Sequence, residues 1–133
     1  MSFDLEMEEW KTEMIMKSGP QNCLVTGGAG FIGSNLVDRL ITDGHFVRVL
    51  DDLSTGDIYN INQKAEFHKI DISSESCFDL FDEIDVVFHL AAFPRVEPSI
   101  KDPMKSHRIN VNGTLNVLKA CVDNKVRRLI FTS

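Results

Sequence analysis

Short apolar runs rich in β-branched residues alternate along this chain with longer stretches that repeat hydrophobic side chains every three or four positions. The short runs predict buried strands and the longer stretches predict amphipathic helices. The clearest helix covers residues 31–43, where Ile32, Leu36 and Leu40 share one face and Gly44 follows as a natural stop. Strands are expected over residues 23–26, 46–50, 65–70, 85–90 and 128–132, and further helices over residues 73–81 and 106–124.

Strands that alternate with helices pair in parallel through right-handed crossovers. The sequence therefore predicts an α/β fold, a Rossmann-like doubly wound parallel sheet of about five strands in the order 3-2-1-4-5. The pattern stops after the fifth strand, so we expect this fold to be incomplete.

The first twenty residues differ from the rest and are expected to form a leader segment (residues 1–20) ahead of one domain (residues 21–133). Acidic residues stand where a signal peptide needs a basic start and an apolar centre. Packing on the domain, association with another chain and fraying all stay open as roles for this segment. A spacing of three and four positions predicts one apolar face of a short helix, made of Phe3, Met7, Trp10 and Met14.

The composition of the 133 residues is that of an ordinary globular protein, with 43% hydrophobic and 26% charged residues. This length fits one domain rather than two. Fourteen Lys and Arg against twenty Asp and Glu give a net charge of −6, which argues against a nucleic acid or an anionic membrane as partner. No run approaches the roughly 18 apolar residues of a membrane span.

Cys23, Cys77 and Cys121 are far apart and match no zinc-ligand spacing, so we expect neither a metal site nor a disulfide framework. Buried reduced thiols fit a cytoplasmic protein. His89 lies inside the predicted strand at residues 85–90, and we interpret it as a packing histidine rather than a general base.

A glycine-rich turn joins the first predicted strand to the first predicted helix. Gly27, Gly30 and Gly33 are three positions apart. At this spacing one glycine allows the tight turn, the next lets backbone approach a pyrophosphate, and the last lets the helix pack closely on the strand. Phosphates at that place meet free backbone N–H groups and the positive end of the helix dipole. The motif therefore predicts a dinucleotide site.

Asp51 follows Gly33 by eighteen residues, at the end of the second predicted strand. A carboxylate there accepts hydrogen bonds from the ribose hydroxyls of adenosine and repels a 2′-phosphate. No Lys or Arg follows before Lys64, so NAD is favoured over NADP as the cofactor. By the same logic Asp71 is expected near the adenine amino group, with an acid at a helix start before Ser73 as the alternative.

Five motifs, in order and at consistent spacing, resemble the extended short-chain dehydrogenases/reductases. Within these the sequence is most similar to the NAD-dependent nucleotide-sugar epimerases and dehydratases of the UDP-glucose 4-epimerase type. The motifs are TGGAGFIGSNL at 26–36, DDLSTG at 51–56, DI at 71–72, HLAA at 89–92 and NVNGTLNVL at 110–118.

The resemblance implies cofactor-binding roles for the matching residues. The pyrophosphate loop would consist of Gly27, Gly30, Phe31, Ile32 and Gly33. Asp51 would hold the ribose, and the adenosine would be enclosed by Asp52, Leu53, Ser54, Thr55 and Gly56. The adenine would be framed by Asp71 and Ile72, and the middle of the cofactor would be lined by Leu90, Ala91 and Ala92.

Two further residues have roles that the resemblance implies less directly. Asn110 resembles the family's asparagine that holds the local conformation near the cofactor, with an ordinary amide on the helix surface as the alternative. Arg95 lies in the loop after the fourth predicted strand and would bind a phosphate of the substrate. A solvated loop arginine is the alternative for Arg95.

The family's catalytic Tyr-x-x-x-Lys pair is absent from this sequence. The single tyrosine, Tyr59, has no lysine four positions later and lies in the loop after the second predicted strand. By the resemblance, the catalytic serine would follow Ser133. The chain thus resembles the first part of such an enzyme, and no catalytic residue is assigned to it.

Three functions follow from these motifs. The first is the NAD-binding part of a nucleotide-sugar epimerase or dehydratase, inactive alone, whose full-length protein binds a UDP-sugar and acts by transient hydride transfer to NAD. The alternative is a stand-alone, non-catalytic dinucleotide-binding or regulatory module, whose exposed fifth strand pairs with a second copy as a homodimer or with a partner protein. A sterol- or flavonol-type reductase is disfavoured, because those enzymes commonly prefer NADP and Asp51 favours NAD.

Overall fold

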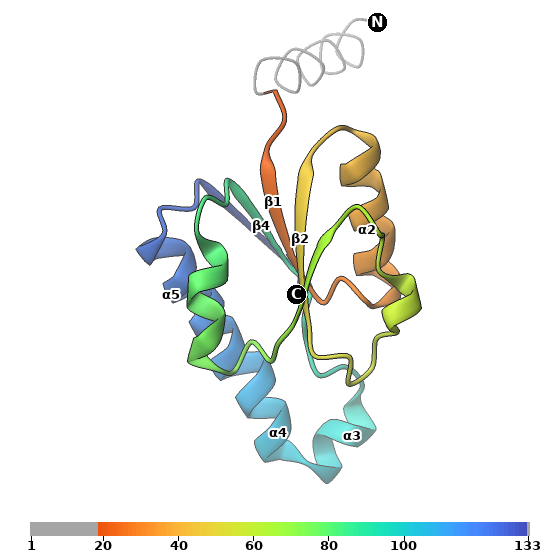
Figure 1. Cartoon of the computed structure of the whole chain (residues 1–133). Coiled ribbons are helices and arrows are strands. Elements are labelled where there is room, and N and C mark those ends of the chain that lie inside the picture. Colours follow the sequence, from red (N-terminus) through yellow and green to blue (C-terminus); the bar gives the residue numbers. More distant parts are fainter. Residues whose placement is uncertain (1–18, 133) are drawn as a thin grey trace, which may run out of the picture.

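The computed structural model describes residues 19–132, so the predicted leader helix lies outside the described residues. Five parallel strands form one sheet in the order β3-β2-β1-β4-β5, which confirms the predicted fold class (Figure 1). The strands are β1 (Asn22–Thr26), β2 (Phe46–Asp51), β3 (Glu66–Lys69), β4 (Val86–His89) and β5 (Arg128–Phe131).

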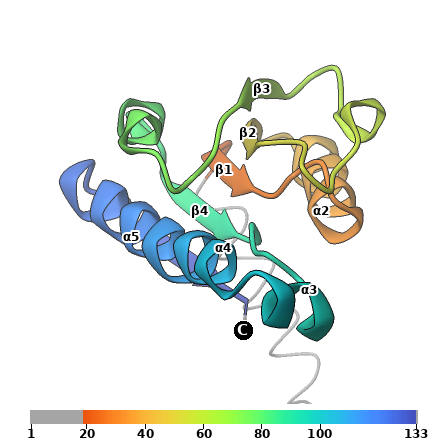
Figure 2. The same ribbon diagram turned by 90° about the horizontal axis from the view of Figure 1, so that it is seen from below.

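Helices cover both faces of the sheet (Figure 2). One face is covered by α2 (Phe31–Thr42), and the other by α5 (Thr114–Asp123) together with the 3-10 helix η2 (Glu75–Phe81). The remaining helical segments are η1 (Ile58–Asn60), α3 (Val96–Lys101), α4 (Pro103–His107) and the π-helical segment η3 (Arg108–Gly113).

The central strand β1 shows why its sequence is apolar throughout. Cys23 and Val25 belong to the hydrophobic cluster on the α2 side, whereas Leu24 belongs to the cluster that contains Phe81 and Val117 on the other side. Successive side chains of a strand point to opposite faces. A parallel sheet covered on both faces therefore needs continuous hydrophobic strands, which is the pattern that the sequence shows.

The helix predicted over residues 106–124 is not one regular helix. It begins earlier, because Asp102 caps α4: its Oδ1 accepts a hydrogen bond from the Lys105 N–H at 3.0 Å, and Pro103 suits the first helical position. The chain then passes through the π-helical η3 before α5 continues the helix. The prediction was therefore right about helical structure and wrong about its start and its regularity.

The segment after β4, predicted as a loop over residues 93–99, contains the start of α3. Pro98 is the third residue of this helix, where the missing N–H leaves no intrahelical hydrogen bond unmade. The proline is therefore compatible with this helix. The helix predicted over residues 73–81 is the 3-10 helix η2, which begins two residues later.

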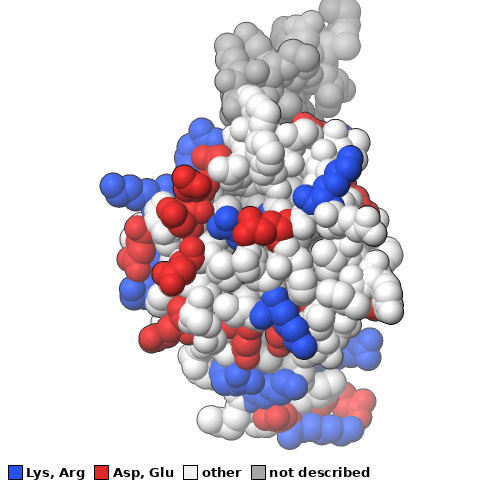
Figure 3. All heavy atoms as spheres, in the orientation of Figure 1, with Lys and Arg blue, Asp and Glu red and all other residues white. Residues whose placement is uncertain are grey.

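Acidic and basic side chains are interspersed over the face shown in Figure 3. Several of them form exposed pairs one helical turn apart, such as Arg39 with Asp43 and Lys119 with Asp123. Pairs of this kind contribute little to stability. None of the described helices is long and apolar enough to cross a membrane.

A buried hydrogen-bond network joins the carboxyl ends of β1 and β4. Thr26 Oγ1 accepts hydrogen bonds from the backbone N–H groups of Leu90 and Ala91, both at 3.1 Å. Because both lone pairs of the hydroxyl are then used, Thr26 donates its own proton to His89 Nδ1 at 2.7 Å. The other ring nitrogen, Nε2, therefore carries the proton and donates it to Thr114 Oγ1 of α5 at 2.9 Å.

His89 is thus a packing histidine, as the sequence predicts. Its side chain is buried, and burial lowers the pKa of His89 to about 4. A proton on Nδ1 would face the Thr26 hydroxyl, which has no lone pair left to accept it. The folded protein therefore holds this ring in the neutral form.

The free energy of unfolding should fall as the pH drops from about 6.5 to about 4. In this range His89 of the unfolded chain binds a proton and His89 of the folded chain does not. The difference corresponds to as much as about 3 kcal/mol. Urea unfolding between about pH 7 and pH 4 should show a shallower pH dependence for His89→Gln, which keeps one donor and one acceptor but cannot titrate.

His107→Gln is the matched control, because it removes an exposed histidine. This variant should keep the pH dependence of the wild type. An equally steep loss of stability in His89→Gln and the wild type would contradict the assignment to His89.

Candidate functional site

A hollow of about 550 Å³ opens at the carboxyl ends of the strands. It lies where the strand order reverses between β1 and β4, the place at which open α/β sheets bind ligands. Most of the predicted site residues line it: Gly27, Gly30, Phe31, Ile32, Gly33, Asp51, Asp52, Ser54, Thr55, Asp71, Ile72, Leu90, Ala91, Ala92 and Arg95.

The three spaced glycines of the turn after β1 meet different constraints. Gly27 has a φ of +74°, and a Cβ there would lie 2.8 Å from the Ala91 nitrogen. A Cβ at Gly33 would collide with the Gly27 carbonyl oxygen, so this glycine lets α2 pack against the turn. A Cβ at Gly30 would have only the Gly27 oxygen nearby, at 3.4 Å, so its surroundings are open.

The start of α2 faces the hollow without a cap. Gly30 is the N-cap residue, no side chain accepts a hydrogen bond from the first turn, and that turn contains no acidic residue. The positive end of the helix dipole is therefore not neutralised by the helix itself. Phe31 and Ile32 are 84% and 70% exposed, respectively, so this helix start is accessible to a ligand.

The Asp51 carboxylate lies at the end of β2 and fixes two loops. Its Oδ2 accepts a hydrogen bond from the Ala29 N–H at 2.9 Å, and its Oδ1 accepts one from the Leu53 N–H at 2.8 Å. A carboxylate offers about four acceptor positions. One position on each oxygen therefore stays available to a pair of hydroxyl groups.

Three predicted site residues, Leu53, Gly56 and Asn110, do not line the hollow. Leu53 acts through its backbone N–H on Asp51. A Cβ at Gly56 would lie 2.7 Å from the Ala29 side chain, so this glycine packs against the glycine turn. These two residues therefore support the neighbours of the hollow rather than its lining, through Asp51 and Ala29.

Asn110 makes its hydrogen bonds to the backbone of one wall of the hollow. Its Oδ1 accepts from the Phe93 N–H at 2.7 Å, and its Nδ2 donates to the Phe93 carbonyl oxygen at 3.3 Å. Both backbone groups of Phe93 are thus held by one side chain. The structure places Asn110 beside the hollow, where it fixes the loop after β4.

The loop after β3 carries Asp71, which is one-third exposed. Its Oδ1 accepts hydrogen bonds from the N–H and the hydroxyl of Ser73, and its Oδ2 accepts one from Arg108 at 3.0 Å. Burial alone would raise the pKa of Asp71, but the hydrogen bonds from Ser73 and Arg108 outweigh it, so the pKa lies below its usual range. The carboxyl group is therefore an ionised acceptor at neutral pH.

The loop after β4 forms the remaining wall. Small side chains at Ala91 and Ala92 leave its backbone open to the hollow. Arg95 is exposed at the rim with a φ of +80°, a conformation that costs a residue with a side chain on the order of 1–3 kcal/mol. Strained residues of this kind concentrate at functional sites, which fits the predicted position of Arg95 at the ligand.

Several residues around the hollow were not predicted from the sequence. Thr26 was identified only as the start of the glycine motif, although a polar residue that ends a buried apolar strand is a signal for a buried hydrogen bond. Thr26 itself does not line the hollow. The lining residues that were not assigned to the site are apolar or small and carry no chemical signature: Leu50, Ile70, Phe93, Pro94, Ile109 and Thr132.

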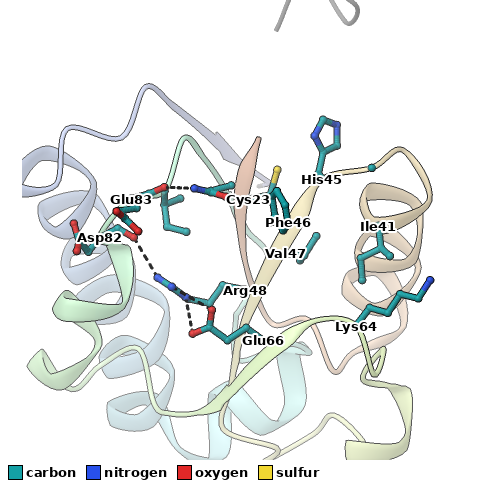
Figure 4. Close-up of a pocket in the computed structure, with 13 residues that line it drawn as sticks. Cys23, Ile41, His45, Phe46, Val47, Arg48, Lys64, Glu66, Asp82 and Glu83 are labelled. Atoms are coloured by element: carbon teal, nitrogen blue, oxygen red, sulfur yellow. Dashed lines mark hydrogen bonds and ion pairs between the residues drawn. The ribbon is translucent and has the colours of Figure 1, made fainter. Parts of the chain in front are cut away.

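A second hollow, of about 510 Å³, lies at the opposite, amino-terminal ends of β1 and β2 (Figure 4). Figure 4 shows Arg48 pointing toward Glu66, and the two side chains form an ion pair at 3.1 Å. Arg48 also donates a hydrogen bond to the Leu80 carbonyl oxygen at 2.7 Å. The arginine is thus engaged within the protein, and ligands of parallel sheets bind at the other end of the strands.

The fold and the first hollow together define a domain of the Rossmann type, the class whose members hold dinucleotides at this place. The residues fit such a group, since an uncapped helix start suits a pyrophosphate and the free positions on Asp51 suit ribose hydroxyls. Residues 23–133 match the model of the NAD dependent epimerase/dehydratase family, and the chain belongs to that family.

Known proteins of similar sequence and structure are longer. The chain is 43% identical over 112 residues to the putative UDP-glucose 4-epimerase of Methanocaldococcus jannaschii, a match that covers 83% of this chain and 37% of that protein. The structure is similar to the UDP-glucose 4-epimerase of Thermotoga maritima with UDP-glucose, with a TM-score of 0.82, 41% identity, and coverage of 84% of this chain and 37% of that one.

The complex of Thermus thermophilus UDP-glucose 4-epimerase with NAD gives a TM-score of 0.81 at 39% identity. This match again covers 84% of this chain and 37% of the other. The chain therefore spans a little over a third of the length of these relatives, which corresponds to their N-terminal part.

We expect Gly33→Ala to lower the free energy of unfolding by about 1–3 kcal/mol, because the new methyl group collides with the Gly27 carbonyl oxygen. The gain of about 1 kcal/mol in helix propensity from glycine to alanine does not offset this collision. Gly30→Ala is the control and should cost less than about 1 kcal/mol, because only an N-cap preference changes. Urea unfolding followed by circular dichroism compares the two, and equal stabilities would contradict the packing role of Gly33.

Proposed function

We propose that this chain is the NAD-binding part of a nucleotide-sugar epimerase or dehydratase, and that the full-length protein acts on a UDP-sugar. Family membership supports the class. The observation that carries the proposal is the meeting of an uncapped helix start and the Asp51 carboxylate at one hollow. The relatives named as UDP-glucose 4-epimerases support a UDP-sugar as the substrate of the whole protein. The buried free thiols fit a cytoplasmic protein.

The pyrophosphate would lie against the turn between β1 and α2. Gly30 leaves room for close approach, and the N–H groups at the start of α2 face outward with the positive end of the helix dipole. Gly27 and Gly33 shape the turn, and the backbone of Phe31 and Ile32 supplies donors. Binding here would therefore come from backbone groups rather than from a lysine or arginine.

The adenosine would lie between the loops after β2 and β3. Asp51 would accept hydrogen bonds from both ribose hydroxyls with its two free positions, while a 2′-phosphate would meet the same carboxylate and be repelled. Asp71 and Ile72 would frame the adenine. The residues that follow Asp51 would enclose the nucleoside, namely Asp52, Leu53, Ser54, Thr55 and Gly56.

The nicotinamide half would lie along the loop after β4. Leu90, Ala91 and Ala92 would allow close approach, and Asn110 would keep this wall in place through Phe93. Arg95 at the rim would bind a phosphate of the sugar nucleotide. When bound, NAD would supply the hydride acceptor for the sugar.

The first test is cofactor preference, measured by calorimetry with the purified chain. NAD should bind more tightly than NADP. Asp51→Asn should weaken NAD binding, and it should reduce the ratio of the NAD and NADP affinities by about tenfold, because the negative charge that repels the 2′-phosphate is gone. Asp79→Asn, a change of the same kind at an exposed position on η2, should leave both affinities unchanged. Tighter binding of NADP than NAD by the wild type would contradict the role of Asp51.

A second test concerns catalysis by the chain alone. We expect the 133 residues to bind NAD weakly. They should convert no UDP-glucose into UDP-galactose, because the single tyrosine of the sequence, Tyr59, is 94% exposed on η1 and has no lysine four positions later. Proton NMR of the sugar nucleotides measures the conversion directly. Tyr59→Phe should leave NAD affinity unchanged. Any turnover by the wild type would overturn the proposed inactivity, and its loss in Tyr59→Phe would assign the activity to Tyr59.

The edge strand β5 offers a place for association, because its outer backbone groups pair with no strand of the described sheet. Ile130 and Phe131 are 38% and 56% exposed, respectively. In the alternative function, a stand-alone dinucleotide-binding module, this edge would pair with a second copy of the chain as a homodimer.

A further inference from the structure

Two walls of the candidate site are held by one short helical segment. The loop after β3, with Asp71 and Ile72, and the loop after β4, with Ala92 and Phe93, both line the hollow. The π-helical segment η3 bonds to both of them, through Arg108 on one side and Asn110 on the other. Single π-helical turns inside α-helices are rare and are found frequently at functional sites.

Arg108 completes the hydrogen bonding of the Asp71 carboxylate. Its Nη1 donates to Asp71 Oδ2 and to Ser73 Oγ, both at 3.0 Å. The Ser73 N–H and hydroxyl both donate to Asp71 Oδ1, at 2.8 and 2.7 Å. Because each carboxylate oxygen accepts about two hydrogen bonds, Oδ1 is saturated and Oδ2 keeps one acceptor position. The carboxylate therefore offers a ligand one hydrogen bond, on one oxygen.

We propose that Arg108 is a positioning residue that directs the free acceptor position of Asp71 into the hollow, and that the site thereby selects a purine with an amino group. This inference rests on the proposed binding of NAD. Adenine presents an N–H donor at its amino group, and that donor would fill the remaining acceptor position of Asp71 Oδ2. Hypoxanthine has a carbonyl oxygen at the same place. This oxygen is a hydrogen-bond acceptor and would face the ionised carboxylate of Asp71, which is also an acceptor. A site built around such a hydrogen bond discriminates strongly against a base that lacks the donor.

The backbone of the Asp71 loop is held independently of Arg108. Asn116 Nδ2 donates to the Ile72 carbonyl oxygen at 3.0 Å. A Cβ at Gly113 would lie 2.8 Å from the Ile72 side chain, so η3 packs directly on this loop. Arg108 itself is half-exposed, and its loss leaves no cavity in either hydrophobic cluster. Removing Arg108 should therefore free the carboxylate while the loop and the fold stay in place.

The experiment compares NAD with nicotinamide hypoxanthine dinucleotide, in which a carbonyl oxygen replaces the purine amino group and the neighbouring N1 carries a proton. Calorimetry with the full chain should show that the wild type prefers NAD by about tenfold. Arg108→Ala should reduce this preference to within about threefold. Arg108→Lys should retain part of it, because a lysine keeps the positive charge and N–H donors but lacks the rigid planar guanidinium. Arg39→Ala removes an exposed arginine that pairs with Asp43 far from the hollow, and it should keep the full preference.

A second measurement needs no cofactor. Carboxyl NMR titration of Asp71 should show a higher pKa in Arg108→Ala than in the wild type, because the charged hydrogen-bond donor is lost. Arg39→Ala should leave the pKa of Asp71 unchanged.

The outcomes separate this inference from the proposed function. A wild type that binds neither dinucleotide would overturn the proposed function and this inference with it. A wild type that binds both equally would refute selection by Asp71, although NAD binding would stand. Equal weakening of both dinucleotides in Arg108→Ala would assign Arg108 a general electrostatic role and overturn its role in positioning.

Discussion

The hydroxyl of Thr26 ties the carboxyl ends of the two central strands together, and the shape of the hollow follows from this link. Thr26 accepts the N–H groups of Leu90 and Ala91 and donates to His89, so every hydrogen-bonding position of the hydroxyl is used. The backbone after β4 is thereby drawn against the turn after β1, so close that only glycine fits at Gly27. The neutral His89 ring extends the same network to α5. One buried hydroxyl thus links β1 to the backbone after β4 and, through His89, to α5. The close approach of the two backbones is also the reason why position 27 requires glycine.

The neighbouring strand ends are connected in a similar way. The Gly27 N–H donates to the Leu50 carbonyl oxygen at 2.8 Å, and the Ile70 N–H donates to the Asp51 carbonyl oxygen at 3.1 Å. The Asp51 side chain adds its two bonds to the loops on either side. The ends of β1, β2, β3 and β4 therefore form one hydrogen-bonded rim around the hollow. A rim held in this way would cost a ligand little reorganisation on binding, which is the advantage of a preorganised site.

The fold was predictable because local patterns determined it. Consecutive apolar residues such as Cys23, Leu24 and Val25 signalled a strand buried on both faces, and glycine spacing placed the turn that follows it. The irregularity of the last helix was not predictable from local patterns, since the π-helical turn at Arg108–Gly113 makes contacts with two distant loops. Nor could spacing show that Leu53 and Gly56 lie outside the lining of the hollow. Leu53 contacts the side chain of Asp51, and Gly56 packs against Ala29 of another loop.

The π-helical segment η3 contacts two walls of the hollow, through Asn110 on one side and Arg108 on the other. Residues two apart on a helix point away from each other, so Arg108 and Asn110 reach opposite walls from a single turn. Gly113 brings the end of this segment against Ile72, where any side chain would force it outward. A helix that must satisfy two loops and one close contact within six residues has little freedom to keep the regular α spacing. The irregular turn thus coincides with the residues through which one helix contacts both sides of the site.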